Sequence, residues 1–278
     1  MKLMTNKVTL DLSFTQVMGI LNVTNDSFYD GGKYNTIANA IDHSACMIQA
    51  GAKIIDVGGE STRPGADVID DNEEAERVIP VVTALVQRFD ILISVNTSSA
   101  LVIRESAAAG VNLINDIRSL SKPGALEAAV KSKLPVCLMH RQGEPLTMQK
   151  KPYYNNIIKE IKEYFLQKIT SCEISGIKKN KLIIDPGFGF GKNLAHNYCL
   201  LARLADFHCF GLPILVGMSR KSMIGNLQPE DRLSGSIACA VIAAMQGAQI
   251  IRVHDVKQTI EALLVVKNTL LAKEKIFL

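Results

Sequence analysis

Eight short apolar runs recur along the chain, and a polar or charged residue stands at or just after the end of each. The runs occupy residues 17–21, 53–57, 91–95, 112–114, 135–139, 182–184, 213–216 and 249–253. Strands of a parallel sheet that helices cover on both faces are continuous runs of Val, Ile and Leu, whereas half-exposed strands alternate. The pattern therefore predicts eight buried parallel strands.

The segments between the runs predict helices. Apolar residues recur at helical spacing in two of them: Val78, Val82, Leu85, Val86 and Phe89, and then Ile157, Ile161, Tyr164, Phe165, Ile169 and Cys172. Thr36 and Ser98 are the expected N-caps, while Gly51, Gly110 and Gly247 stand where helices would end.

Strand and helix alternating eight times in 278 residues predict a single-domain (β/α)8 TIM barrel over residues 1–278, with a short N-terminal extension. An open doubly wound sheet is the competing arrangement. In a barrel, the residues that end the eight strands converge on one rim. They are Asn22, Asp56, Asn96, Asn115 with Asp116, His140, Asp185, the Ser219–Lys221 trio, and Arg252 with His254.

Composition favours a compact enzyme, with 47% hydrophobic and 21% charged residues. The net charge of +4 is small, and no Lys/Arg block is interleaved with aromatics, so we expect no nucleic-acid partner. The longest apolar run, residues 237–245, is far short of the roughly 20 residues of a membrane span. The six cysteines form no CxxC pair and are expected to be reduced core thiols in a cytoplasmic protein.

Two loops near the N-terminus carry candidate chemistry. Residues 22–32 form a loop rich in Asn, Asp, Ser and Gly, typical of a mobile catalytic loop or of a solvated turn. In residues 56–65, glycines let the backbone approach a ligand, and Arg63 is suited to a carboxylate or phosphate. An exposed arginine is the alternative there.

A third segment runs from Asp185 to Lys192 and continues at residues 216–222. It is not a nucleotide triphosphate loop, because the spacing before Lys192 is one residue short and Asn193 replaces the required Ser or Thr. Asp185 is suited to accept two parallel N–H bonds from a guanidine-like ligand edge. A carboxylate that caps a helix or braces the loop is the alternative.

Six motifs in these regions resemble the dihydropteroate synthase family of pterin-binding barrels, over essentially the whole chain. They are Asn22-Val-Thr-x-Asp-Ser-Phe28 with Asp30-Gly-Gly32, Glu60-Ser-Thr-Arg-Pro-Gly-Ala66, Ile114-Asn-Asp116, Asp185-Pro-Gly-Phe-Gly-Phe-Gly-Lys192, Ser219-Arg-Lys-Ser222 and Arg252-Val-His-Asp255. The family joins 6-hydroxymethyl-7,8-dihydropterin diphosphate to 4-aminobenzoate in folate biosynthesis, with release of diphosphate, and is the target of sulfonamides.

The resemblance implies a role for individual side chains. The pterin would be held by Asn96, Asn115, Asp185 and Lys221, and the diphosphate by Asn22, Arg63, Arg252 and His254. Aminobenzoate would lie among Phe28, Thr62, Pro64, Phe190 and Ser222. Asp30, Arg63 and Lys221 would be catalytic, in a dissociative displacement in which diphosphate leaves before the amine attacks.

The resemblance also implies a cofactor and a partner. Mg²⁺ would be bound by Asn22 and the diphosphate, since this ion prefers hard oxygen ligands. The helix expected at residues 234–245 is apolar nearly all round, which indicates either a homodimer contact or broad burial against the barrel.

Two residues depart from the family pattern: Asn25 replaces a proline, and Asn96 replaces an aspartate that helps to hold the pterin. If the pocket is otherwise intact, Asn96→Asp should tighten pterin binding. If neighbouring groups have adjusted to the amide, the new carboxylate should weaken it. The alternatives to a synthase are a methyltransferase of the related barrel family and a non-catalytic pterin-binding paralogue, the latter suggested only by Asn96.

Overall fold

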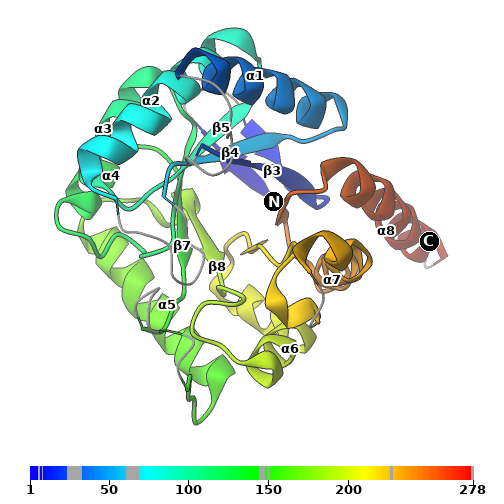
Figure 1. Cartoon of the computed structure of the whole chain (residues 1–278). Helices are drawn as coiled ribbons and strands as arrows, with labels where there is room; N and C mark the ends of the chain where they lie inside the picture. The colour runs from blue at the N-terminus through cyan, green and yellow to red at the C-terminus, as the bar shows by residue number, and fades with distance from the viewer. Residues whose placement is uncertain are drawn as a thin grey trace.

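The computed structural model describes residues 1–5, 7, 9–23, 33–60, 69–143, 148, 151–225 and 228–276. Its centre is a ring of parallel strands, and Figure 1 shows the helices arranged around the outside of that ring. The strands are β3 (Gln16–Asn22), β4 (Ile54–Gly58), β5 (Leu92–Asn96), β6 (Leu113–Asp116), β7 (Val136–Met139), β8 (Leu182–Asp185), β9 (Leu215–Val216) and β10 (Ile250–Val253). Each lies within or next to an apolar run that the sequence singled out.

The sheet order is β8-β7-β6-β5-β4-β3-β10-β9, so every strand pairs in parallel with its neighbour in the ring. The remaining gap, between β9 and β8, is bridged by a parallel pair of Ile184 with Ile214 and by a backbone hydrogen bond of 3.0 Å from Ile184 N to Pro213 O. The (β/α)8 barrel is therefore confirmed, and an open doubly wound sheet is ruled out.

The helices of the described part are α1 (Lys33–Gln49), α2 (Asp71–Arg88), α3 (Ala100–Ala109), α4 (Ala125–Ser132), α5 (Ile157–Ile174), α6 (Leu194–Ala202), α7 (Leu233–Met245) and α8 (Val256–Ile276). Short 3-10 helices occupy η2 (Lys179–Lys181), η3 (Leu204–Phe210), η4 (Ser222–Ile224) and η5 (Pro229–Arg232). Among these described helices, none is both long and apolar enough to cross a membrane.

Two details of the helix ends differ from expectation. Thr36 lies inside α1, which already begins at Lys33. Ser99, not Ser98, caps α3 by accepting a hydrogen bond from Val102 N, because the Ser98 hydroxyl donates to Asp116 instead. The glycine predictions hold: Gly51, Gly110 and Gly247 all have φ values near +100° (+107°, +100° and +85°), which glycine adopts without strain.

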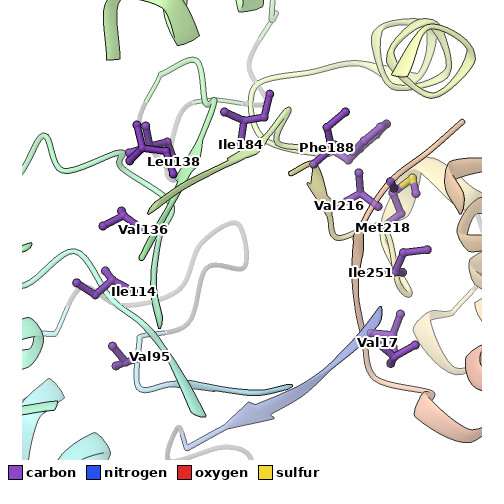
Figure 2. Packing of buried hydrophobic residues seen from close by; sticks show 14 of the residues in the cluster. Val17, Val95, Ile114, Val136, Leu138, Ile184, Phe188, Val216, Met218 and Ile251 are labelled. Atoms are coloured by element: carbon purple, nitrogen blue, oxygen red, sulfur yellow. The ribbon is translucent and has the colours of Figure 1, made fainter. Parts of the chain in front are cut away.

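The core has two parts. Outward-facing strand residues such as Val95, Val136 and Ile251 pack beneath the helices, and Figure 2 shows them on the outer side of the ring. Inside the barrel, Met18, Ile54, Leu92, Leu113, Cys137, Ile183, Leu215 and Ile250 form a separate apolar layer. The N-terminal hairpin of β1 (Lys2–Met4) and β2 (Thr9–Asp11) adds Leu3 to this layer, as does Leu12 just after β2.

All six cysteines are free, but the prediction of core thiols holds only for some of them. Cys137, Cys172 and Cys239 are buried, whereas Cys46 and Cys209 are exposed. Cys46 lies on α1 and Cys209 in η3, where one side of an outer helix faces solvent.

Candidate active site

A polar layer lies directly above the apolar layer inside the barrel. Side chains two residues apart on a strand point to the same face, so each strand carries a second inward residue beyond its apolar one. These second residues are Ile20, Asp56, Ser94, Asn115, Met139, Asp185, Gly217 and Arg252. Four of the eight carry a charged or amide side chain, and three of those four were predicted to bind ligands.

Asp56 is the fourth, which was expected among the polar residues of the rim but without a particular ligand. Its carboxylate is fully buried, and Oδ2 accepts hydrogen bonds from Arg252 Nε at 2.6 Å and from Asn115 Nδ2 at 3.0 Å. Asn96 Nδ2 approaches the same oxygen at 3.3 Å. One carboxylate thus orients three predicted ligand-binding side chains from three strands. Its other oxygen, Oδ1, is buried without a hydrogen bond partner in the described structure.

Asp185 ends β8 and is 6% exposed. Its Oδ1 accepts a hydrogen bond of 2.8 Å from Gly187 N, so the loop-bracing interpretation holds for one oxygen. Each carboxylate oxygen has two acceptor positions, which leaves capacity for a ligand edge. Burial raises the pKa of Asp185, while the positive charge of Lys221 opposes that shift.

Lys221 reaches the same region from the loop after β9. Its Nζ donates to Phe188 O at 2.6 Å and lies 4.5 Å from the centre of the Phe190 ring. Burial lowers the pKa of Lys221 to about 8, against the attraction of Asp185. The ammonium therefore loses its proton as the pH rises through about 8, at a lower pH than a surface lysine does.

The glycine-rich segment after β8 is a close-packed turn. A Cβ on Gly187, whose φ is +73°, would lie 1.8 Å from His140 O, and a Cβ on Gly191 would lie 2.2 Å from Gln142 O. Lys192 is buried, and its Nζ lies 3.0 Å from both His140 Nδ1 and Phe190 O. The Nζ of Lys192 therefore contacts groups inside the protein, which agrees with the prediction that this segment is not a nucleotide triphosphate loop.

Burial shifts the ionisation of both Lys192 and His140, and Lys192 adds to the shift of His140. Burial lowers the pKa of Lys192 well below its usual value. Burial, and then the charge of Lys192, lowers the pKa of His140 well below its usual value. His140 also contacts the Tyr164 ring edge-on, with centroids 4.9 Å apart. Neutral His140 is best described as part of the wall that supports the glycine-rich turn.

The predicted anion-binding residues come from both ends of the chain. Asn22 ends β3, and Arg252 and His254 lie on and just after β10, the strand that pairs with β3. His254 N donates to Ser219 Oγ at 3.2 Å, and its Nδ1 lies 3.0 Å from the same hydroxyl. Ser219 thus fixes the orientation of the imidazole, with Nε2 on the opposite side of the ring.

The predicted aminobenzoate residues are only partly described. Phe190 is 8% exposed and packs with Ile117, Met139 and Met148 in a small apolar cluster at the rim. Ser222 is exposed and begins η4, a single 3-10 turn. The other predicted side chains lie outside the described residues: Phe28, Asp30, Thr62, Arg63 and Pro64.

A charged network borders the loop after β4. Arg118 forms a forked ion pair with Glu60, with N–O distances of 2.7 and 2.8 Å. Asp116 accepts from the backbone N–H groups of Arg118 and Leu120, so it braces the turn after β6. Glu74 is 3% exposed, and burial raises its pKa to about 7.

Comparison with known proteins agrees with the motifs. The family model for pterin binding enzymes matches residues 18–254. The dihydropteroate synthase of Escherichia coli K12 is 64% identical over 99% of this chain and 98% of its own length. The Yersinia pestis enzyme, solved with a sulfonamide drug, has a TM-score of 0.93 at 62% identity, covering 97% of this chain and 99% of its own. The Xanthomonas albilineans enzyme with 7,8-dihydropteroate has a TM-score of 0.88 at 40% identity, covering 97% and 98%.

Proposed function

This chain belongs to the pterin-binding enzyme family, as a dihydropteroate synthase, and from that premise we propose how its residues divide the work. The enzyme is a transferase of folate biosynthesis. It joins 6-hydroxymethyl-7,8-dihydropterin diphosphate to 4-aminobenzoate, which gives 7,8-dihydropteroate and diphosphate. Beyond the sequence identity, the structural observation that supports this function most directly is the polar layer, which gathers Asp56, Asn115, Asp185 and Arg252 at the barrel mouth.

The pterin binds in this polar layer. Its amino-pyrimidinone edge presents adjacent N–H donors, which match the acceptor capacity of Asp185. Asn115 donates from Nδ2 to Asp56, so its amide oxygen is turned away from that carboxylate and toward other partners. Lys221 donates to the pterin carbonyl or a ring nitrogen, after exchanging its bond to Phe188 O.

The diphosphate binds next to the pterin, where Arg252 and His254 supply donors and positive charge. Arg252 uses Nε for Asp56, and its terminal guanidinium nitrogens are suited to phosphate oxygens. Ser219 occupies His254 Nδ1, so Nε2 is the nitrogen that contacts the anion. Asn22 and Arg63 complete this site, as the resemblance implies.

The donor set at Asn22 fits Mg²⁺. Asn22 ends β3 next to Gly58, where a Cβ would lie 3.9 Å from Asn22 Oδ1, so no side chain from that neighbour covers the oxygen. No cluster of three or more His, Cys, Asp or Glu residues suited to a metal occurs in the described part of the chain. Mg²⁺ commonly combines one or two protein oxygens with substrate phosphates and water. When bound, the ion neutralises charge on the diphosphate.

The reaction is a dissociative displacement. The diphosphate leaves first, and the electron-rich pterin delocalises the positive charge on its exocyclic methylene. Arg252 and His254 stabilise the departing anion, which is the kind of electrostatic stabilisation that lowers such barriers most. Asp30 stabilises the cation, and the neutral amine of 4-aminobenzoate attacks last. Aminobenzoate lies against Phe190, with its carboxylate near Ser222, and sulfonamides compete with it.

The protein acts as a cytoplasmic homodimer. Helix α7 buries its small residues Cys239, Ala240 and Ala243 against its own barrel, yet leaves Ile242 and Met245 exposed by 44% and 51%. The adjoining α8 exposes Leu264 and Val265 by 57% and 66%. A second subunit would cover these apolar side chains. Sedimentation at micromolar concentration should show a dimer, and a monomer at every concentration would exclude it.

Incorporation of isotope-labelled 4-aminobenzoate into dihydropteroate tests the synthase function. We expect label in dihydropteroate only when the pterin substrate carries diphosphate. A methyltransferase would instead consume methyltetrahydrofolate, and a binding paralogue would bind pterin diphosphate without incorporating label. Either result would contradict the synthase.

A further inference from the structure

Two charged residues lie within the motifs of the site but have no role in the substrate assignments above. Arg220 stands between Ser219 and Lys221, and Asp255 directly follows His254. Arg220 donates from Nε to Asp255 Oδ2 at 3.0 Å and from Nη2 to Asp255 Oδ1 at 2.6 Å. This forked geometry is the strongest form of an Arg–carboxylate pair. It joins the loop after β9 to the loop after β10.

The backbone of Arg220 is strained and held in place. Its φ is +59°, a left-handed conformation that residues other than glycine adopt rarely. Two further contacts fix it there. Arg220 N donates to Ser236 Oγ at 2.9 Å, and Arg232 Nη1 donates to Arg220 O at 2.9 Å. Strain that surrounding contacts maintain is common where side chains must be aimed.

The turn at Arg220 sends the residues before and after it to different parts of the pocket. The residue before it, Ser219, contacts His254, whereas the residue after it, Lys221, reaches Phe188 O on the other side of the pocket. A right-handed conformation at Arg220 would change the course of the chain between these two contacts. Ser219 precedes Arg220 and His254 precedes Asp255, and Ser219 and His254 are also hydrogen-bonded to each other. With the chain links 219–220 and 254–255, the ion pair therefore closes a small ring of contacts that contains His254.

We propose that Arg220 and Asp255 are positioning residues, whose ion pair holds Lys221 on the pterin side and His254 on the diphosphate side of the site. This inference rests on the substrate assignments of the proposed function. Arg220 acts through its neighbours, and its guanidinium is neutralised by Asp255. The competing role, direct binding of the aminobenzoate carboxylate by Arg220, is separated from positioning by the experiment.

A double-mutant cycle tests the proposal, with Arg220→Gln, Asp255→Asn and the double variant. Each single change should weaken pterin diphosphate binding about tenfold, as expected from losing the alignment of one charged hydrogen bond. Binding of free hydroxymethyl pterin should weaken only about threefold, because that ligand loses the alignment of Lys221 but has no diphosphate for His254 to contact. The double variant should be no worse than either single one, because both remove the same contact.

Matched controls separate positioning from general loss of stability. Arg203 and Asp206 form a similar ion pair, with Nε to Oδ2 at 2.9 Å, on the outer surface between α6 and η3. Arg203→Gln and Asp206→Asn should leave both affinities unchanged. Asp255→Glu keeps the charge and should recover part of the lost diphosphate affinity, and Arg220→Lys should recover less because lysine lacks the fork.

Three outcomes would overturn the inference. Losses that multiply in the double variant would mean that the two residues act independently. Equal losses for both pterin ligands, with a lowered melting temperature, would mean a purely structural pair. A raised KM for 4-aminobenzoate alone in Arg220→Gln would mean direct carboxylate binding. A wild-type protein that incorporates no labelled aminobenzoate would instead contradict the synthase function, independently of the cycle.

Discussion

Arg252 Nε donates to Asp56 Oδ2 at 2.6 Å across the barrel mouth, although β3 separates their two strands in the sheet. The Asp56 carboxylate is fully buried and the Arg252 side chain is 20% exposed. Removing one member of a buried ion pair leaves the other charge uncompensated, which is far more costly than the pair itself is stabilising.

We therefore expect Asp56→Asn to lower the free energy of unfolding by about 3 kcal/mol, near the lower end for a buried pair because Arg252 is partly exposed. Urea denaturation measures this loss. The control is Asp90→Asn, which breaks the exposed Lys7–Asp90 pair and should cost less than about 1 kcal/mol. Equal losses for the two variants would contradict the role given to Asp56.

His254→Ala should weaken binding of the pterin diphosphate but not of free hydroxymethyl pterin. A charged hydrogen bond contributes roughly 1.5 to 3 kcal/mol, about ten- to a hundredfold in affinity, and only the diphosphate can accept it. Calorimetry with both ligands measures the difference. Arg252→Ala should show the same selectivity on top of a stability loss, because it also leaves Asp56 unpaired. Equal losses for the two ligands would remove the anion-site assignment.

Asn96→Asp should not tighten pterin binding at pH 8. The Asn96 amide approaches Asp56 Oδ2 at 3.3 Å as a donor, so a carboxylate there would place two acceptors and two negative charges side by side. This hydrogen bond favours the alternative in which the pocket has adjusted to the amide. Calorimetry at pH 8 measures the pterin affinity of both forms, and a clear gain for the variant would contradict this account.

Lys221→Ala should impair use of both substrates, because Lys221 interacts with the Asp185 charge and lies over the Phe190 ring. In the wild type, the lowered pKa of about 8 means that the ammonium is lost as the pH rises through 8. The KM for pterin diphosphate should therefore increase as the pH is raised above 8. Lys221→Arg should flatten this alkaline limb, even if its activity is low, since arginine stays protonated. An unchanged limb in that variant would assign the titration to another group.

Glu74→Gln should stabilise the protein more at pH 8 than at pH 5. The folded-state pKa of Glu74 is raised from 4.5 to about 7 by burial, so the folded protein favours the protonated acid. Stability from that preference is present below pH 4.5 and is lost as the pH rises through about 7. Glutamine mimics the protonated form, so the variant does not lose this stability at high pH. At roughly 1.4 kcal/mol per pKa unit, its free energy of unfolding at pH 8 should be higher by up to about 3 kcal/mol. Urea denaturation at the two pH values measures it, and an equal effect at both would contradict the shift.

The barrel could be predicted from the sequence because its strands are buried on both faces. An unbroken apolar run such as Val136–Met139 is distinctive, and the recurrence of eight such runs along the chain leaves few possible folds. Local details were less accessible. Thr97, Ser98 and Ser99 are all good capping residues, and the choice of Ser99 depends on Asp116, a partner far along the chain.

The ends of the strands predicted much of the site, but not the group that organises it. Asp56 is flanked by apolar residues, and a lone carboxylate in a buried strand was the available signal. Its importance depends on three donors from β5, β6 and β10, which no local pattern reveals. Lys192 likewise stands in a glycine-rich motif, yet its partners are His140 and a backbone carbonyl.

The bond between Asp56 and Arg252 joins residues 196 positions apart, and it has a consequence for how the protein is made. During synthesis, the ribosome releases β4 long before β10, so for most of that time Asp56 has no guanidinium to meet. Chains interrupted before β10 would contain Asp185 and Asn115 but lack Arg252 and His254. Pterin diphosphate in the cell would then stabilise finished chains in preference to fragments, so that the substrate itself helps to distinguish complete enzyme from incomplete products.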